Sequence, residues 1–309
     1  MIYTVRGAIK KEELGITLSH EHLYWGGFDV ESMYFEKKYE EEKTVQVYHV
    51  LLPLFKKLYQ TGCRTVVETS PPEGSQNLKL MQMLSRASGI NILPNTGMAF
   101  STHIYDIHKH ADEMELAKRW IEDFEKGLDT INGVTIRPSQ IKIFTNRGKL
   151  SEAYKKIIKA TVIASRETGM PIHCHILETG TAEEVIDLLE RVDCNFNKFL
   201  WAHASADANK ETMARALSKG MWLGFDDVKK DSLQKYCTLV KEAFEKGYQD
   251  RILLSQDYDF YEEMVNSPEN QPCTDLFTDF IPYCEEMGLA PKVLEDILVK
   301  NPADFFDME

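Results

Sequence analysis

The sequence lacks the features that mark several large classes of protein. Its 309 residues include six cysteines, and no two of them stand in CxxC spacing. Scattered cysteines of this kind fit reduced structural thiols better than a disulfide framework or a zinc knuckle. Basic residues are also few, with 36 Lys and Arg against 49 Asp and Glu, and no basic run offsets the net charge of -13. Because this balance repels phosphate backbones and anionic membranes, we expect neither a nucleic-acid nor a membrane partner.

Long apolar runs and targeting segments are missing as well. No stretch approaches the ~20 apolar residues that a helix needs to cross a bilayer. The opening Met1–Arg6 lacks a basic region followed by an apolar one, so no secretory signal is visible and we expect a cytoplasmic protein. No linker rich in Pro, Gly or Ser interrupts the chain. We therefore predict a single domain spanning residues 1–309.

What is present is a regular alternation of short β-like runs with longer segments of helical period. After a short opening strand, eight runs qualify as strands: Ile16–Leu23, Arg64–Ser70, Asn91–Met98, Gln140–Asn146, Pro171–Leu177, Phe199–Ser205, Trp222–Asp227 and Arg251–Asp257. The segment Glu152–Thr168 shows the apolar stripe of a packed helix. Several helical segments end at a glycine suited to a left-handed cap: Gly62, Gly89, Gly169 and Gly220. Eight β/α units predict an α/β fold, a (β/α)₈ TIM barrel with a short N-terminal strand extension.

Residues able to bind metals or transfer protons fall on these apolar runs: His20, His22, Lys142, His173, His175, His203 and Asp257. Burying a neutral polar group without a partner costs roughly 2–7 kcal/mol, so such residues need a reason to be there. In a barrel of this kind, active sites form at the carboxyl ends of the strands, which is where these residues lie. Since side chains alternate along a strand, His20 and His22 should face one cation together, and Glu21 between them should face away.

The order of these motifs resembles the phosphotriesterase-like family of the amidohydrolase superfamily, which includes phosphotriesterases, lactonases and other metal hydrolases. The resemblance covers nearly the whole chain, at Thr4–Gly7, Leu14–His22, Ile141–Ile143, Pro171–His175, Ala202–Ala204, Leu254–Asp257 and Asn301–Ala303. It implies two divalent metal ions as cofactors. His20, His22 and Asp257 would hold one ion, His175 and His203 the second, and a carbamylated Lys142 would bridge them.

The resemblance also separates the two histidines that share one face of the fifth run. It places the ligand four residues after Pro171, at His175, and leaves His173 as a hydrogen-bonded histidine deeper in the barrel. Zinc is the expected metal, although His, carboxylate and carbamate ligands also suit manganese, iron or cobalt. A lysine buried among apolar strands has a lowered pKa, and this favours the neutral amine that reacts with carbon dioxide.

This ligand set implies a metal-bridged hydroxide that attacks a carboxyl ester or lactone, with Asp257 as the catalytic residue that accepts the proton. Phosphotriester hydrolysis at the same site is the alternative. Two further alternatives stay open, namely a non-catalytic barrel that binds a metal or ligand, and a mononuclear enzyme in which Lys142 is unmodified. The partner is a small-molecule substrate, and the sequence leaves the oligomeric state open, a homodimer included.

Residues in the loops that follow the strands are candidates for the substrate pocket: Tyr24, Trp25, Phe100, Asp227 and Tyr258. For each aromatic residue, packing within its loop is an equally good interpretation. A second histidine group, His103, His108 and His110, has no acidic or thiol residue at ligand spacing. We interpret it as part of an exposed loop or helix start, with a separate metal site as the alternative.

Overall fold

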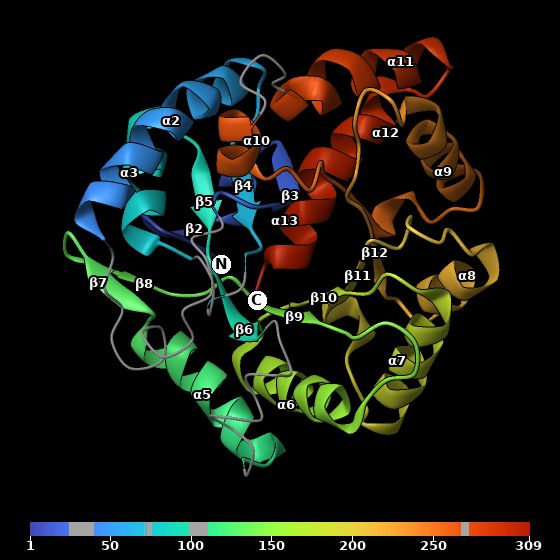
Figure 1. Ribbon diagram of the computed structural model, residues 1–309. Coiled ribbons are helices and arrows are strands. Elements are labelled where there is room, and N and C mark those ends of the chain that lie inside the picture. The colour runs from blue at the N-terminus through green and yellow to red at the C-terminus, as the bar shows by residue number, and fades with distance from the viewer. Residues whose placement is uncertain (25–39, 71, 73–75, 99–110, 267–271) are drawn as a thin grey trace.

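The computed structural model describes residues 1–24, 40–70, 72, 76–98, 111–266 and 272–309, and it confirms the predicted TIM barrel. Helices lie outside a ring of parallel strands (Figure 1). The strands of the ring are β3 (Thr17–Glu21), β4 (Thr65–Glu68), β5 (Asn91–Leu93), β6 (Asn95–Met98), β9 (Gln140–Phe144), β10 (Ile172–His175), β11 (Phe199–Ala202), β12 (Trp222–Phe225) and β13 (Ile252–Leu254). Each predicted run therefore contains a strand, and the runs extend beyond the strands mostly at their carboxyl ends.

One prediction about the ring needs correction, because the run Asn91–Met98 forms two strands. Strand β5 pairs with β4, and β6 pairs with β9. Pro94 lies between β5 and β6 and has no N–H to donate to a ladder, so the change of partner falls where the ladder is weakest. The parallel strands thus form one sheet in the order β13-β12-β11-β10-β9-β6 and another in the order β3-β4-β5.

The ring closes between β3 and the end of β13 through single hydrogen bonds and not through a regular ladder. The Asp257 N–H donates to the His20 carbonyl oxygen (3.2 Å), and the His22 N–H donates to the Tyr258 carbonyl oxygen (3.0 Å). The register of β3 also shifts between Leu18 and Glu21. Irregular pairing of this kind re-aims side chains, and here it occurs beside the predicted metal ligands.

The helices that cover the ring are α2 (Glu41–Gln60), α3 (Leu78–Ser88), α5 (Glu113–Lys126), α6 (Glu152–Thr168), α7 (Thr179–Arg191), α8 (Lys210–Ser218) and α9 (Leu233–Glu245), followed by the short helices α10 (Phe260–Asn266), α11 (Ile281–Glu286), α12 (Pro291–Glu295) and α13 (Asn301–Phe306). Helix α6 has the predicted bounds and ends at Gly169 in the left-handed conformation, as α3 does at Gly89. Among the helices that the structure describes, none combines the length and apolarity that crossing a membrane requires.

Two hairpins and an apolar cluster complete the barrel. The N-terminal extension is a hairpin, β1 (Ile2–Thr4) with β2 (Gly7–Ile9), and not a single strand, and β7 (Asp129–Ile131) pairs with β8 (Val134–Ile136). A buried cluster joins barrel strands to both chain termini, with the Trp222 and Phe305 ring centroids 5.5 Å apart. This apolar cluster contains none of the predicted metal ligands. Apolar and polar side chains are therefore gathered in two different regions of the barrel.

Candidate metal centre

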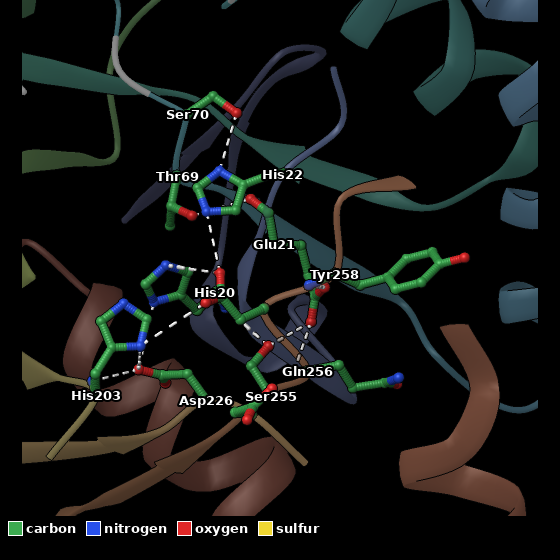
Figure 2. Close-up of polar contacts among 12 residues, drawn as sticks. His20, Glu21, His22, Thr69, Ser70, His203, Asp226, Ser255, Gln256 and Tyr258 are labelled. Carbon is green, nitrogen blue, oxygen red and sulfur yellow. Dashed lines mark hydrogen bonds and ion pairs between the residues drawn. The ribbon is translucent and has the colours of Figure 1, made fainter. Parts of the chain in front are cut away.

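Polar side chains from five strands meet near the carboxyl ends of the ring. His20 lies on β3 and Lys142 on β9, His175 ends β10, and His203 and Asp257 follow β11 and β13. Figure 2 shows His20, His22, His203 and Asp226 turned toward one another. The structure therefore brings together every residue predicted as a metal ligand, and adds Asp226.

The Asp257 carboxylate is shared by three imidazoles. Its Oδ1 lies 3.1 Å from His22 Nε2 and 3.5 Å from His20 Nε2, and its Oδ2 lies 3.8 Å from His203 Nδ1. Burial alone would raise the pKa of Asp257, but the neighbouring imidazoles outweigh burial and lower it below its usual range. The carboxylate is therefore ionised at neutral pH and can act as a ligand or as a proton acceptor.

A second carboxylate, Asp226, was not among the residues predicted from the sequence. Its Oδ2 accepts a hydrogen bond from the His203 backbone N–H (2.7 Å) and lies 3.4 Å from His20 Nδ1 and 3.6 Å from His203 Nδ1. Burial raises the pKa of Asp226 to about 6. Its buried Oδ1 has no hydrogen-bond partner among the described residues. An unsatisfied buried carboxylate oxygen beside imidazoles indicates a missing cation or water.

A signal for Asp226 was present in the sequence. Alternation along Trp222–Asp227 places Trp222, Gly224 and Asp226 on one face of the strand and Asp227 on the other. The ideal Cβ of an alanine at position 224 would lie 2.6 Å from Asp226 Oδ1 and 2.7 Å from its Oδ2. Only glycine at 224 leaves room for this carboxylate.

Lys142 is completely buried in the same cluster. Its Nζ lies 3.3 Å from His20 Nε2 and 5.0 Å from the centroid of the Phe144 ring. Burial lowers the pKa of Lys142 to about 8, although Asp257 and Asp226 oppose this shift. The neutral amine is thus far more abundant than for an exposed lysine. The neighbouring strand approaches closely, since a Cβ at Gly97 would lie 1.9 Å from the Lys142 carbonyl oxygen.

His175 and His173 lie on the same face of β10 but have different surroundings. The His175 ring stacks on Phe144, with centroids 4.8 Å apart, and meets the His203 ring edge to face at 4.4 Å. The completely buried His173 contacts His20 instead, with ring centroids 4.7 Å apart. Burial lowers the pKa of each of these two histidines, and lowers that of His203 to about 4. These imidazoles are therefore neutral at pH 7 and able to offer a lone pair to a metal.

The backbone is strained at two of the predicted ligands. His203 has φ +62° and Asp257 has φ +48°, a region that non-glycine residues seldom adopt. Backbone strain of this kind costs of order 1–3 kcal/mol and is found preferentially at functional sites. It lies here at the carboxyl ends of β11 and β13, where the two side chains turn toward the cluster.

Glu21 lies between two predicted ligands but turns away from them, as the sequence indicates. Its Oε1 accepts hydrogen bonds from Ser255 Oγ (2.7 Å) and the Gln256 N–H (2.9 Å), and its Oε2 accepts one from the Tyr258 N–H (2.8 Å). Figure 2 shows this carboxylate directed at the segment of Ser255, Gln256 and Tyr258. Glu21 thereby fastens that segment to β3 and supports the site from outside the cluster.

The predicted pocket residues that the structure describes have different surroundings. The half-buried Tyr24 packs edge to face on Tyr261, with centroids 5.1 Å apart. The exposed Asp227 pairs with Lys229, with Oδ1 and Nζ 2.7 Å apart. Tyr258 differs from the prediction, because its side chain is buried against Phe260 and turned away from the histidines (Figure 2). Trp25 and Phe100 lie outside the described residues, as do His103, His108 and His110.

The donor set suits divalent metal ions. Two buried or partly buried groups, His20 with His22 and Asp257, and His20 with His203 and Asp226, each place one ligand atom per residue within 4.8 Å of the others. Neutral imidazoles and ionised carboxylates are the ligands that zinc and related ions prefer. The chemistry of the donors and the unsatisfied Asp226 oxygen therefore fit a metal centre.

Comparisons with known proteins agree with this geometry. The chain is 26% identical to an aryldialkylphosphatase of Saccharolobus solfataricus, over 97% of this chain and 98% of that protein. It is 26% identical to a phospho-furanose lactonase of Mycoplasmopsis synoviae, over 97% of this chain and 89% of that protein. A mutant of a lactonase from Deinococcus radiodurans that resembles phosphotriesterases has the same fold, with a TM-score of 0.85 at 21% identity, covering 99% of this chain and all of that one. Since the sequence pattern of the phosphotriesterase family matches residues 1–306, the chain belongs to that family.

Proposed function

We propose that the protein is a binuclear metal-dependent hydrolase whose substrate is a small carboxyl ester or lactone. The observation that carries the proposal is the sharing of the Asp257 carboxylate by three imidazoles beside the buried amine of Lys142. Charged and polar groups are buried together at such a cost only where something compensates them. Two cations held there would supply Lewis acidity and a water of lowered pKa.

Each residue of the cluster has a proposed part in holding the ions. His20, His22 and Asp257 hold the first ion, and His175 and His203 hold the second. Lys142, carbamylated on Nζ, lies between the two sets, and its low pKa supports this modification. Asp257 has a second part as the proton acceptor, because its carboxylate is ionised at neutral pH and lies beside the histidines that hold the ions. Asp226 orients the site through the His203 backbone N–H.

An ester or lactone is favoured over a phosphotriester because two of the similar proteins are described as lactonases. The phosphotriester reaction stays as the second candidate, since another similar protein is described as an aryldialkylphosphatase. Both reactions need the same polarised oxygen and the same nucleophile, so the metal cluster alone does not separate them. The preference for one substrate class over the other is expected to depend on the loops that follow the strands.

A hydrolysis screen with controlled metal content tests the proposal. Purified protein is stripped of metal, reloaded with zinc, manganese or cobalt, and assayed on lactones, carboxyl esters and phosphotriesters. We expect metal-dependent hydrolysis with lactones or esters as the best substrates, and loss of nearly all turnover in Asp257→Asn. Fewer than one bound cation per chain and no rate on any substrate would instead identify a non-catalytic barrel.

Two variants separate the remaining alternatives. Asp193→Asn is a matched control for Asp257→Asn, because Asp193 also has a positive φ, of +52°, but is exposed at the end of α7. We expect this control to keep full activity. Lys142→Ala should lose the second metal if the centre is binuclear. Two ions retained in Lys142→Ala would contradict a bridging lysine, whereas a single ion in the unaltered chain would favour a mononuclear enzyme.

A further inference from the structure

A line of three buried side chains leads from the floor of the metal centre to His20. Gln140 Oε1 lies 2.9 Å from His173 Nδ1, and His173 Nε2 lies 3.1 Å from His20 Nδ1. All three residues are at most 1% exposed. The predicted ligand set leaves His173 and Gln140 without a function, yet burying a third imidazole so close to His20 needs a reason.

Gln140 fixes which atoms donate and which accept along this series of hydrogen bonds. Gln140 Nε2 donates a hydrogen bond to the Glu68 backbone carbonyl oxygen (3.2 Å), and a carbonyl oxygen can only accept. The carboxamide therefore cannot be turned round, and its Oε1 faces His173. Since Oε1 is also only an acceptor, His173 Nδ1 must carry the proton of that hydrogen bond.

The position of the proton on His173 then determines the position of the proton on His20. The two ring nitrogens of the completely buried His173 face an amide oxygen and another imidazole, and a charge buried there without a carboxylate partner would be costly. His173 therefore carries one proton, on Nδ1, and its Nε2 holds a lone pair that accepts a hydrogen bond. His20 Nδ1 must donate that hydrogen bond. The Asp226 Oδ2, 3.4 Å from the same His20 nitrogen, is a second acceptor and favours the same arrangement. The neutral His20 ring is thereby left with its lone pair on Nε2, facing Lys142 and Asp257.

His22 is oriented in the same way by a different partner. Its Nε2 faces Asp257 Oδ1 at 3.1 Å, and its Nδ1 faces Ser70 Oγ at 3.1 Å. Both histidines of the pair thus turn Nε2 toward the same carboxylate and Nδ1 toward a polar group behind the site. Groups that hold the far nitrogen of a ligand histidine set its tautomer and its basicity as a ligand.

We propose that His173 is a positioning residue that fixes His20 in the Nδ1–H tautomer, so that Nε2 is the atom that His20 offers to a metal. This inference rests on the proposed function for the identity of the ligand, but the tautomer itself is a property of the metal-free chain. It also assigns Asp226 to orienting His20, because a protonated Nδ1 cannot bind a cation together with Asp226.

Two readouts test the proposal without relying on turnover. Long-range ¹⁵N–¹H spectra of the metal-free chain labelled at histidine report which nitrogen carries each proton, with His20 assigned through a His20→Asn variant. Titration with Co²⁺, followed by its visible absorption, reports the affinity of the site. We expect His20 and His173 both as Nδ1–H tautomers in the unaltered chain, and tight cobalt binding.

Variants at position 173 separate positioning from packing. His173→Leu removes the acceptor, so His20 should become a mixture of tautomers and bind cobalt about 10- to 100-fold more weakly, as is typical when a residue behind a ligand is lost. His173→Gln retains a carbonyl for His20 and an amide for Gln140, and should restore most of the affinity. His49→Leu, an exposed histidine on α2, is the unaffected control.

The outcomes are distinguishable. A proton on Nε2 of His20 in the unaltered chain would overturn the proposal, as would unchanged cobalt affinity in a folded His173→Leu variant. If that variant does not fold, the His173→Gln titration and the spectra of the unaltered chain still decide. An Nδ1–H tautomer of His20 without any cobalt binding would overturn the proposed function and leave the tautomer assignment standing.

Discussion

Replacing Gly224 by alanine should displace the Asp226 carboxylate and weaken the site. The new Cβ would lie 2.6 Å from Asp226 Oδ1, whereas ordinary contact begins near 3.4 Å, so the carboxylate must move by roughly 0.8 Å. This shift stretches the 2.7 Å hydrogen bond from the His203 N–H to Asp226. Because Gly224 does not have a positive φ, the effect comes from the contact and not from backbone strain.

The expected magnitude follows from the hydrogen bond that is lost. A hydrogen bond to a buried charged group contributes about 1.5–3 kcal/mol, and alanine returns about 0.4–1 kcal/mol by restricting the unfolded chain. The net loss in the free energy of unfolding should be about 1–2 kcal/mol. Misplacing groups in a catalytic site by about 1 Å can cost on the order of 10²-fold in rate, so kcat/KM should fall by up to roughly that factor.

Urea unfolding followed by circular dichroism, together with kcat/KM on the best substrate of the screen, measures both effects. The matched control is Gly180→Ala in α7, where the added Cβ meets no heavy atom within 4 Å. That variant should be as stable as the unaltered chain or slightly more so, with unchanged turnover. If Gly224→Ala matched the unaltered chain in both measurements, Asp226 would have no place in orienting the site.

Three further predictions concern other parts of the centre. Glu21→Gln replaces one carboxylate oxygen by an NH₂ group, which would face one of the N–H or O–H donors that now bind Glu21. The free energy of unfolding, measured by the urea midpoint, should therefore fall by about 1–3 kcal/mol. An unchanged midpoint would contradict the proposal that Glu21 holds the segment of Ser255 to Tyr258 on β3. With a pKa of about 8, Lys142 is neutral in roughly a tenth of metal-free molecules at pH 7 and in most at pH 9, so ¹³C-bicarbonate labelling of Lys142, seen by NMR, should increase over that range and then level off; labelling that is slight at pH 9 and still rises steeply above it would refute the lowered pKa. Chelation should lower the melting temperature, because ions at 100 times their dissociation constant stabilise the folded chain by about 2.7 kcal/mol, and zinc should restore it; a melting temperature indifferent to chelator argues against tight binding.

The barrel could be predicted from the sequence because its strands are short apolar runs separated by helices of clear period. The break at Pro94 was missed, since a β-like run of eight residues interrupted by one proline still has the appearance of a single strand. The change of pairing partner there depends on how β5 and β6 meet β4 and β9, which is a tertiary property.

The candidate ligands could be predicted because histidine, lysine and aspartate are costly on buried strands. Asp226 was missed because its exposed neighbour Asp227 was predicted to lie near Asp257, although alternation along the strand favours Asp226. The orientation of the Tyr258 side chain could not be predicted, because an aromatic residue after a strand can pack outward as easily as toward a site. The line from Gln140 through His173 to His20 joins residues from three strands, and only their placement in space reveals it.

Anomalous diffraction from crystals of the zinc-loaded protein would test the central claim, a binuclear centre built on five strands, most directly. We predict two zinc peaks about 3.5–4 Å apart, one beside His20, His22 and Asp257 and the other beside His175 and His203. Density extending from Lys142 Nζ should join them. A single peak, no peak, or two peaks elsewhere in the molecule would contradict a binuclear centre at these residues.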